Sequence, residues 1–248
     1  MPSIVGAAIL SDTDLYASYT TQPSGYNVGD YRMATGGRGV RLVYTGASAL
    51  VKGNLLQESA EDTTYENMVI GTAGVVGDRF LQITNGTATI TSQKFEGGSV
   101  GIYTSGTDLI GDYYVITSVT GTLTTGGALK VWLDRPLRYA VTTGATVNMK
   151  RSPFSGVIQA PATTQTGMAV GVAIYEVPAT AYGWVQSHGE CTVLSDGSTF
   201  AVGSDVGTPS GTAGCVTVFA AGTTHQRVGV ARQAAASGHG ISMFLQID

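Results

Sequence analysis

Short stretches in which apolar and polar residues alternate recur along most of the chain, separated by glycine-rich turns. Alternation with a period of two is the pattern of a β-strand with one buried face. In the middle of the chain the turns include Asn85-Gly86, Gly97-Gly98 and Gly126-Gly127, where Asn and Gly tolerate the positive φ of tight turns. The pattern predicts strands over Arg79–Thr84, Ala88–Gln93, Ser99–Thr104, Asp112–Val119, Ala128–Leu133 and Ala145–Lys150. Strands so closely spaced favour one compact barrel or sandwich at residues 77–152.

A second antiparallel series follows residues 151–164, which we interpret as a linker because prolines and small polar residues dominate there. The last strand of this series alternates most clearly, and its inward face is predicted to carry Ile241, Met243, Leu245 and Ile247. Residues 153–248 are therefore predicted to form a C-terminal β-barrel or sandwich module.

The beginning of the chain is patterned differently. Residues 1–29 are polar without sustained periodicity, so we expect an extended N-terminal arm. Residues 30–76 contain two strand-like runs around Gly36-Gly37, a hairpin signal, but too few strands to close a core. We expect this block to pack with the C-terminal module, which makes residues 77–152 an insertion. The predicted fold class is all-β: two antiparallel β-barrel or sandwich modules with an extended N-terminal arm.

The stretch Ala181–Glu190 concentrates more interaction-capable side chains than any other. Alternation predicts a half-buried strand with Tyr182, Trp184, Gln186 and His188 on one face. Aromatic side chains in strands are usually part of a core, but Trp and Tyr are also enriched where proteins bind one another. These four residues are therefore candidates for either a core or an interface.

Three arginines near the predicted hairpin form a second candidate surface. Arg32, Arg38 and Arg41 are interspersed with apolar residues, which we interpret as one basic face of the hairpin. Such a face serves either simply to contact solvent or to bind a partner.

Composition narrows the classes of function. Only 12% of the residues are charged, about half of the roughly 25% typical of soluble domains, which suits a surface packed against copies or partners. The net charge of −4 argues against nucleic acid as a partner, because phosphate binding needs clustered basic residues. No apolar run approaches the roughly 20 residues that cross a bilayer, and the start of the chain has no basic secretory signal, so no membrane partner is expected.

Candidate chemistry is sparse. Cys191 and Cys215 lack metal-ligand spacing, and we interpret them as buried free thiols, with a disulfide between them as the alternative. His188, His225 and His239 have no carboxylate or cysteine placed to complete a metal site. The segment Gly207–Gly211 has proline where a nucleophile elbow has serine. We therefore expect no catalytic residue, no metal and no cofactor.

Several segments resemble virion structural proteins of tailed bacteriophages, commonly of the capsid decoration (cement) class. The resemblance is carried by 181–186, 189–197 and 228–231 near the C-terminus and by 95–98, 111–116 and 133–137 in the middle. It covers parts of residues 30–248 and is absent from the N-terminal arm.

The resemblance implies a non-enzymatic virion protein. Such a protein would sit on the capsid surface and would stabilise the lattice by binding the major capsid protein as a homotrimer. The alternative is a phage tail, baseplate or head-fibre protein that binds a host-surface glycan. That alternative requires an exposed aromatic cluster, for which Trp132 and Trp184 are the candidates.

Overall fold

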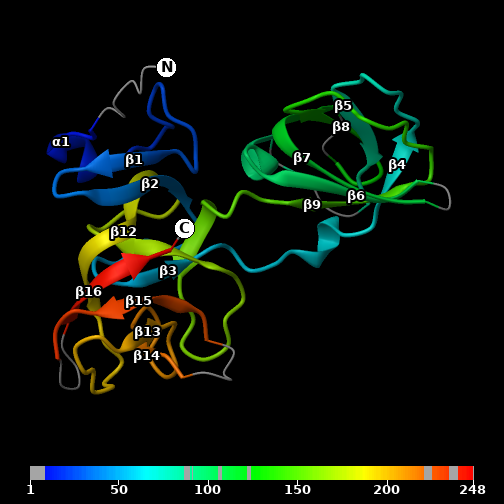
Figure 1. Cartoon of the computed structure of the whole chain (residues 1–248). Coiled ribbons are helices and arrows are strands. Elements are labelled where there is room, and N and C mark those ends of the chain that lie inside the picture. The colour runs from blue at the N-terminus through cyan, green and yellow to red at the C-terminus, as the bar shows by residue number, and fades with distance from the viewer. Residues whose placement is uncertain are drawn as a thin grey trace, which may run out of the picture. The chain divides into compact units, whose positions relative to one another are not determined.

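The computed structural model describes residues 9–86, 90, 92–105, 108–121, 124–220, 225–234 and 240–247. The fold is all-β, as predicted, and its described helical segments are the short α1 (Asp12–Leu15), η1 (Thr63–Tyr65) and η2 (Ser92–Phe95). The chain divides into two compact units (Figure 1). We call residues 61–152 the barrel unit, and the residues up to Ala60 together with those from Pro153 onward the sheet unit.

The barrel unit is a closed barrel in the order β4-β5-β8-β7-β6-β9. Every strand pairing in it is antiparallel. Inward-pointing side chains such as Ile83, Val100, Tyr114 and Val131 fill its core. Its strands are β4 (Met68–Thr72), β5 (Phe80–Thr84), β6 (Ser99–Ser105), β7 (Asp108–Gly121), β8 (Ala128–Leu133) and β9 (Thr146–Lys150).

The barrel unit begins earlier than the sequence pattern indicated. The expected boundary at residue 77 is wrong because β4 pairs with both β5 and β9 and thereby closes the barrel. Of the strand predicted at Ala88–Gln93, residues 88, 89 and 91 lie outside the described residues, and Ser92 begins the 3₁₀ turn η2.

The sheet unit contains the remaining strands in the order β1-β2-β10-β3-β11-β12-β16-β15-β13-β14. The N-terminal strand β3 lies between the C-terminal strands β10 and β11, and β10 lies between β2 and β3. The N-terminal and C-terminal strands therefore form one sheet. The strands are β1 (Tyr31–Ala34), β2 (Arg38–Thr45), β3 (Leu55–Gln57), β10 (Ser155–Gln159), β11 (Ala169–Ala173), β12 (Tyr182–Leu194), β13 (Asp205–Gly207), β14 (Thr217–Val218), β15 (Arg227–Ala231) and β16 (Gly240–Gln246). The predicted hairpin is confirmed: β1 and β2 pair antiparallel around Gly36 and Gly37, both with positive φ.

An additional pairing of β2 with β12 closes the run β2-β10-β3-β11-β12 into a ring. The ring encloses small and branched apolar side chains, among them Val43, Leu56, Val157 and Val185. The expected linker at 151–164 is therefore wrong in part, because Ser155–Gln159 is the strand β10, which joins β2 to β3.

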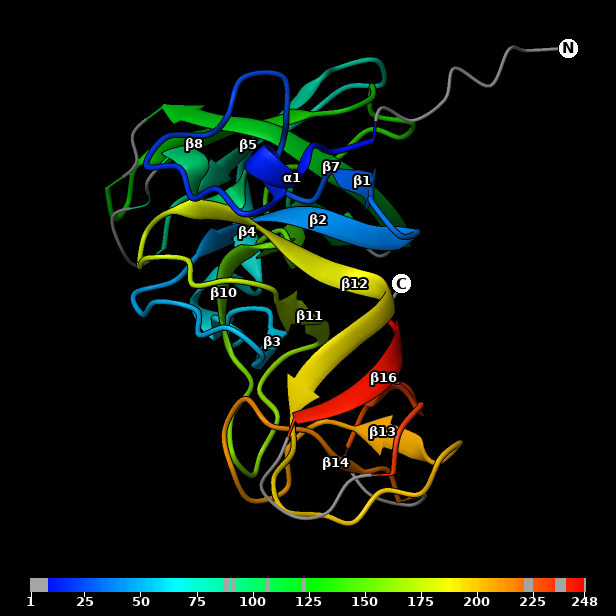
Figure 2. The ribbon, with the colours of Figure 1, turned by 90° about the vertical axis from the view of Figure 1, so that its left-hand side faces the viewer.

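The strand β12 continues beyond the ring and pairs there with β16, so that it belongs to two parts of the sheet unit (Figure 2). The second part has its own core, to which Val193, Phe200, Val206 and Val228 contribute. The predicted inward face of the last strand is confirmed: Ile241, Met243 and Leu245 are fully buried, and Ile247 packs partly buried against them.

The described part of the predicted arm, residues 9–29, is not extended. It folds over the outer face of β2 and β12, where Leu10 and Leu15 are buried together with Leu42 and Trp184. The backbone of Tyr19 bridges Tyr182. This packing leaves no periodic pattern in the sequence, because Leu10, Leu15 and Tyr26 are spaced irregularly among polar residues. They nevertheless cover an apolar face that would otherwise meet water.

Candidate interaction surface

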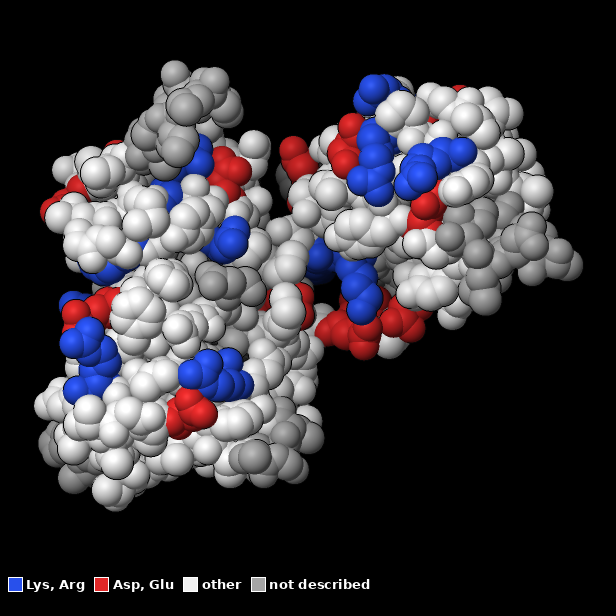
Figure 3. Space-filling view, in the orientation of Figure 1, with Lys and Arg blue, Asp and Glu red and all other residues white. Residues whose placement is uncertain are grey.

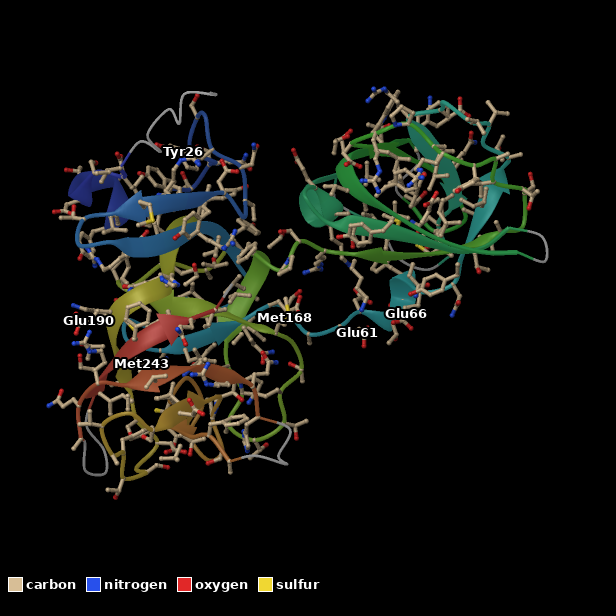
Figure 4. The ribbon with its side chains drawn as sticks, viewed as in Figure 1. Tyr26, Glu61, Glu66, Met168, Glu190 and Met243 are labelled. Carbon is tan, nitrogen blue, oxygen red and sulfur yellow. The ribbon has the colours of Figure 1, made fainter. Side chains whose placement is uncertain are left out.

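The candidate residues of β12 lie mainly inside the sheet unit. Trp184 is 1% exposed and packs edge-to-face against Tyr26, with ring centroids 5.3 Å apart. Tyr26, labelled in Figure 4, comes from the N-terminal segment that covers β1 and β2. Because its indole is enclosed by the chain itself, Trp184 is a core residue and offers no surface to a partner.

Gln186 is also buried, and its amide serves the backbone. Nε2 donates to the carbonyl oxygens of His188 (3.0 Å) and Glu190 (2.9 Å). The pairing with β2 shifts register between Gln186 and His188, and Gly189 follows with a φ of 93°. The amide therefore satisfies carbonyl groups at a β-bulge.

Tyr182 and His188 are only half-buried, yet both side chains contact other rings of the sheet unit. Tyr182 packs against Tyr44 with centroids 4.8 Å apart, and His188 packs edge-to-face on Phe244 at 5.3 Å. The half-buried strand expected here is wrong for Gly183–Ser187, which is buried throughout. One face of this segment lines the ring and the other is covered by residues 9–29.

The three candidate arginines do not share a face. Arg32 lies opposite Val40 in the β1–β2 register, and Arg38 lies on the same side as Val40, whereas Arg41 lies opposite Val185 on the ring side. The reason is their spacing: residues 38 and 41 are an odd number apart and so point to opposite faces of a strand. The single basic face expected from the sequence is therefore wrong.

Each of these arginines contacts the sheet unit itself. The Arg32 guanidinium lies 5.2 Å from the Tyr26 ring centroid, and Arg38 Nε donates to the Thr35 carbonyl oxygen at 3.1 Å. Arg41 Nη1 donates to the Gly29 carbonyl oxygen at 3.0 Å. Arg32 and Arg41 therefore hold the segment before β1, whereas Arg38 holds the turn between β1 and β2.

A surface that the sequence reasoning missed lies on the barrel unit. On the outer face of β4, β9, β6 and β7, Tyr113 is 57% exposed, Tyr103 46%, Val69 44% and Val115 37%. We call these four residues the tyrosine face. Their neighbours along the strands point inward, as the burial of Met68, Ile102 and Tyr114 shows.

The pairing registers place the tyrosine face around a shallow centre. Gly101 lies between Tyr113 on β7 and Asn148 on β9. A β-carbon on Gly101 would lie 3.7 Å from the Tyr103 ring, so this ring leans over the glycine. The centre therefore has no side chain of its own and is bordered by aromatic and polar groups.

Charged residues stand at one end of the tyrosine face. Lys150 shares a register row with Ser99 and Val115 and pairs with Glu61 at 3.1 Å. The hydrogen bond from Lys150 lowers the pKa of Glu61, and the same bond raises the pKa of Lys150, so both remain ionised near neutrality. An aromatic and apolar centre with charges at its border is the composition of a protein interface.

One signal in the sequence could have revealed this surface. A strand with one solvated face should be apolar at alternate positions only, but in Tyr113-Tyr114-Val115-Ile116 both sets of positions are apolar. Apolar residues at the outward positions as well indicate that a binding partner covers the outer face of this strand.

The histidines and cysteines are the candidate reactive groups that the sequence offers. No cluster of three or more His, Cys, Asp or Glu side chains suited to a metal occurs among them, and His239 lies outside them. Cys191 and Cys215 are both free thiols. Burial, aided by the Glu190 charge, raises the pKa of Cys191 to about 12, so its thiol is a poor nucleophile.

Within the described residues, no helix has the length and apolar content that a membrane crossing requires. Comparison of the chain with protein-family models, with curated proteins and with solved structures found no match.

Proposed function

We propose that this chain is a structural protein of a tailed-phage virion that binds the outer capsid surface and stabilises the lattice of the major capsid protein. The observation that carries the proposal is the tyrosine face, because exposed tyrosines on a rigid sheet are typical of protein contact surfaces. The segments that resemble phage virion proteins and the low share of charged residues, 12%, support it.

The resemblance also supports a homotrimer. Subunits of 25.5 kDa that assemble in threes would present three tyrosine faces to the lattice. Repeated contacts then act by avidity, so that each one need not be tight.

Co-sedimentation with capsid shells that lack this protein tests the proposal. The wild-type chain should pellet with the shells and raise their resistance to heat. The double variant Tyr103→Ser/Tyr113→Ser should bind at least about tenfold more weakly, because interface tyrosines are often worth 2 kcal/mol or more. Tyr139→Ser is the matched control, since Tyr139 is 55% exposed in the loop between β8 and β9.

A wild-type chain that stays in the supernatant with intact shells would refute capsid binding. Light scattering of the same samples tests the trimer: a double variant that becomes monomeric but still pellets would assign the tyrosine face to contacts between copies of this chain.

The second candidate is a tail, baseplate or head-fibre protein that binds a host-surface glycan. Of the two tryptophans proposed for this role, Trp184 is buried, whereas Trp132 is partly exposed beside a second ring. Binding to host cells but not to shells would favour this candidate.

A further inference from the structure

The barrel unit carries a second group of partly exposed aromatic side chains on its other wall. Phe80 on β5 and Trp132 on β8 are opposite each other in the register, with ring centroids 5.4 Å apart. Both point outward, because Leu81, Val131 and Leu133 beside them are buried in the barrel. This wall, formed by β5 and β8, is separate from the strands β6 and β9 at the middle of the tyrosine face.

A lysine lies over both rings. Lys130 Nζ is 4.0 Å from the centroid of Phe80 and 5.0 Å from that of Trp132. Among the described residues, no carboxylate lies within ion-pair distance of Lys130. By contrast, Lys94 and Lys150 of the same unit each pair with an acid. The ammonium group of Lys130 is therefore a cation on this wall, and no carboxylate of the described residues neutralises its charge.

The orientation of the tryptophan is held by a hydrogen bond. Trp132 Nε1 donates to Thr120 Oγ1 on β7 at 3.1 Å. Gln82, opposite Lys130 in the register, adds a half-buried amide on the same wall. The two rings, the lysine and the amide lie on paired strands, which hold them in fixed positions. Binding a ligand would therefore cost little conformational entropy.

We propose that this wall binds a saccharide that carries a carboxylate. The apolar face of a sugar ring packs on aromatic side chains, the amide exchanges hydrogen bonds with hydroxyl groups, and the ammonium pairs with the carboxylate. A nucleic acid fits less well, because phosphate binding needs several clustered cations and the chain has a net charge of −4.

The arrangement of charge on the barrel unit agrees with an anionic ligand. In Figure 3, Lys and Arg side chains lie on the upper part of this unit with a few Asp and Glu side chains among them, whereas acidic side chains with neighbouring lysines lie at its lower edge, where Figure 4 labels Glu61 and Glu66. The inference does not depend on capsid binding, since the wall would serve a capsid protein and a tail protein alike.

The test is a titration of the full-length chain with oligogalacturonate, followed by the NMR signals of the indole N–H groups. The chain has two tryptophans, so Trp132 is identified by the signal that Trp132→Phe removes. The Trp132 signal should shift to saturation while the Trp184 signal stays in place. A neutral galactose oligomer of equal length should bind at least about fivefold more weakly, because it lacks the charge.

Variants locate the site. Lys130→Gln should weaken oligogalacturonate binding about fivefold and abolish most of its salt dependence. Trp132→Leu, which lacks the reporting indole and is therefore titrated by calorimetry beside the wild-type chain, should weaken binding about tenfold. Lys52→Gln is the control, since Lys52 is an exposed cation of the sheet unit, and it should leave the affinity unchanged. Tyr103→Ser/Tyr113→Ser should also leave it unchanged, which separates this site from capsid binding.

Three results would overturn the inference: no shift of the Trp132 signal at millimolar oligogalacturonate, equal binding of the neutral oligomer, or an equal loss of affinity in Lys52→Gln and Lys130→Gln. Hydrogen exchange of peptides from residues 61–152 reports whether each barrel variant keeps its fold, whereas the signal of the buried Trp184 reports on the sheet unit alone.

Discussion

The barrel unit and the sheet unit are assembled from different parts of the chain. In the barrel unit, β5 pairs with β4 before it, and β7 pairs with its sequence neighbours β6 and β8. In the sheet unit, β2 near the N-terminus pairs with β12 near the C-terminus, as in the pair Tyr44 and Tyr182. Three of the six strand pairings of the barrel unit join sequence neighbours, and the other three stay within residues 61–152. The sheet unit, in contrast, forms only when both ends of the chain meet.

The difference also shows in the side chains. The strands of the barrel unit alternate between buried and exposed residues, as in β8 and β9, because only the inner face is covered. In the sheet unit β3 and β11 are buried at every position. Strands buried on both faces need covering segments, as residues 9–29 cover the outer face of β2 and β12. Independent cores predict that damage to one unit leaves the other intact.

The largest effect is expected from Trp184→Ala. Removing this fully buried side chain should lower the free energy of unfolding of the sheet unit by about 3–5 kcal/mol. Hydrogen exchange followed by mass spectrometry, read separately for peptides of each unit, should show lost protection in the sheet unit alone. Ile83→Ala in the barrel core should show the reverse. Equal losses in both units after either substitution would mean that they unfold together.

A smaller effect tests whether the N-terminal segment is part of the sheet unit. Leu15→Ala should cost about 2–3 kcal/mol, because Leu15 is fully buried against the outer face of β2 and β12. Ile9→Ala, at a residue 70% exposed, should change stability by less than about 0.5 kcal/mol in the same urea titration. If Leu15→Ala destabilised the protein as little as Ile9→Ala, the result would support the extended arm that the sequence predicts.

Acid should affect the sheet unit through Asp196. Burial by itself would raise the pKa of this carboxyl, but hydrogen bonds from Ser198, Ser210 and Thr217 outweigh burial and lower the pKa below 3.8. The stabilisation is present above that value and is lost as the pH falls through the lowered pKa. Because Asp196 is partly solvated, Asp196→Asn should reduce the loss of unfolding free energy between pH 6 and pH 3 by only about 0.5 kcal/mol. Urea titrations at pH 6 and pH 3 measure it, and an unchanged difference between the two pH values would contradict the assignment.

The smallest effect is expected from thiol labelling of the native protein. Both cysteines belong to the sheet unit, and burial raises the pKa of each thiol, so a disulfide reagent at pH 8 should react slowly with them. In Trp184→Ala labelling should accelerate, because the sheet unit opens more often, whereas Ile83→Ala should leave the labelling rate unchanged. Rapid labelling of the wild-type chain would show that the thiols are accessible.

From the sequence alone one could predict the all-β class, most strands of the barrel unit and the inward face of β16. These follow from local alternation and from turns such as Gly126-Gly127, because a strand covered on one face leaves a period of two in its own residues. The tyrosine face also has a signal in the sequence, because the unbroken run 113–116 is apolar at the outward as well as the inward positions.

Other features depend on contacts between residues far apart in the chain. The burial of Gly183–Ser187 on both faces requires the ring on one side and Leu10, Leu15 and Tyr26 on the other. No pattern within β12 identifies those partners, so the sequence favoured a core position for Trp184 but left an interface as the alternative. Likewise, the cation at Lys130 and the rings of Phe80 and Trp132 become one surface only when β5 pairs with β8. Alternation is a property of one strand, whereas burial and surface chemistry depend on which strands and segments lie beside it.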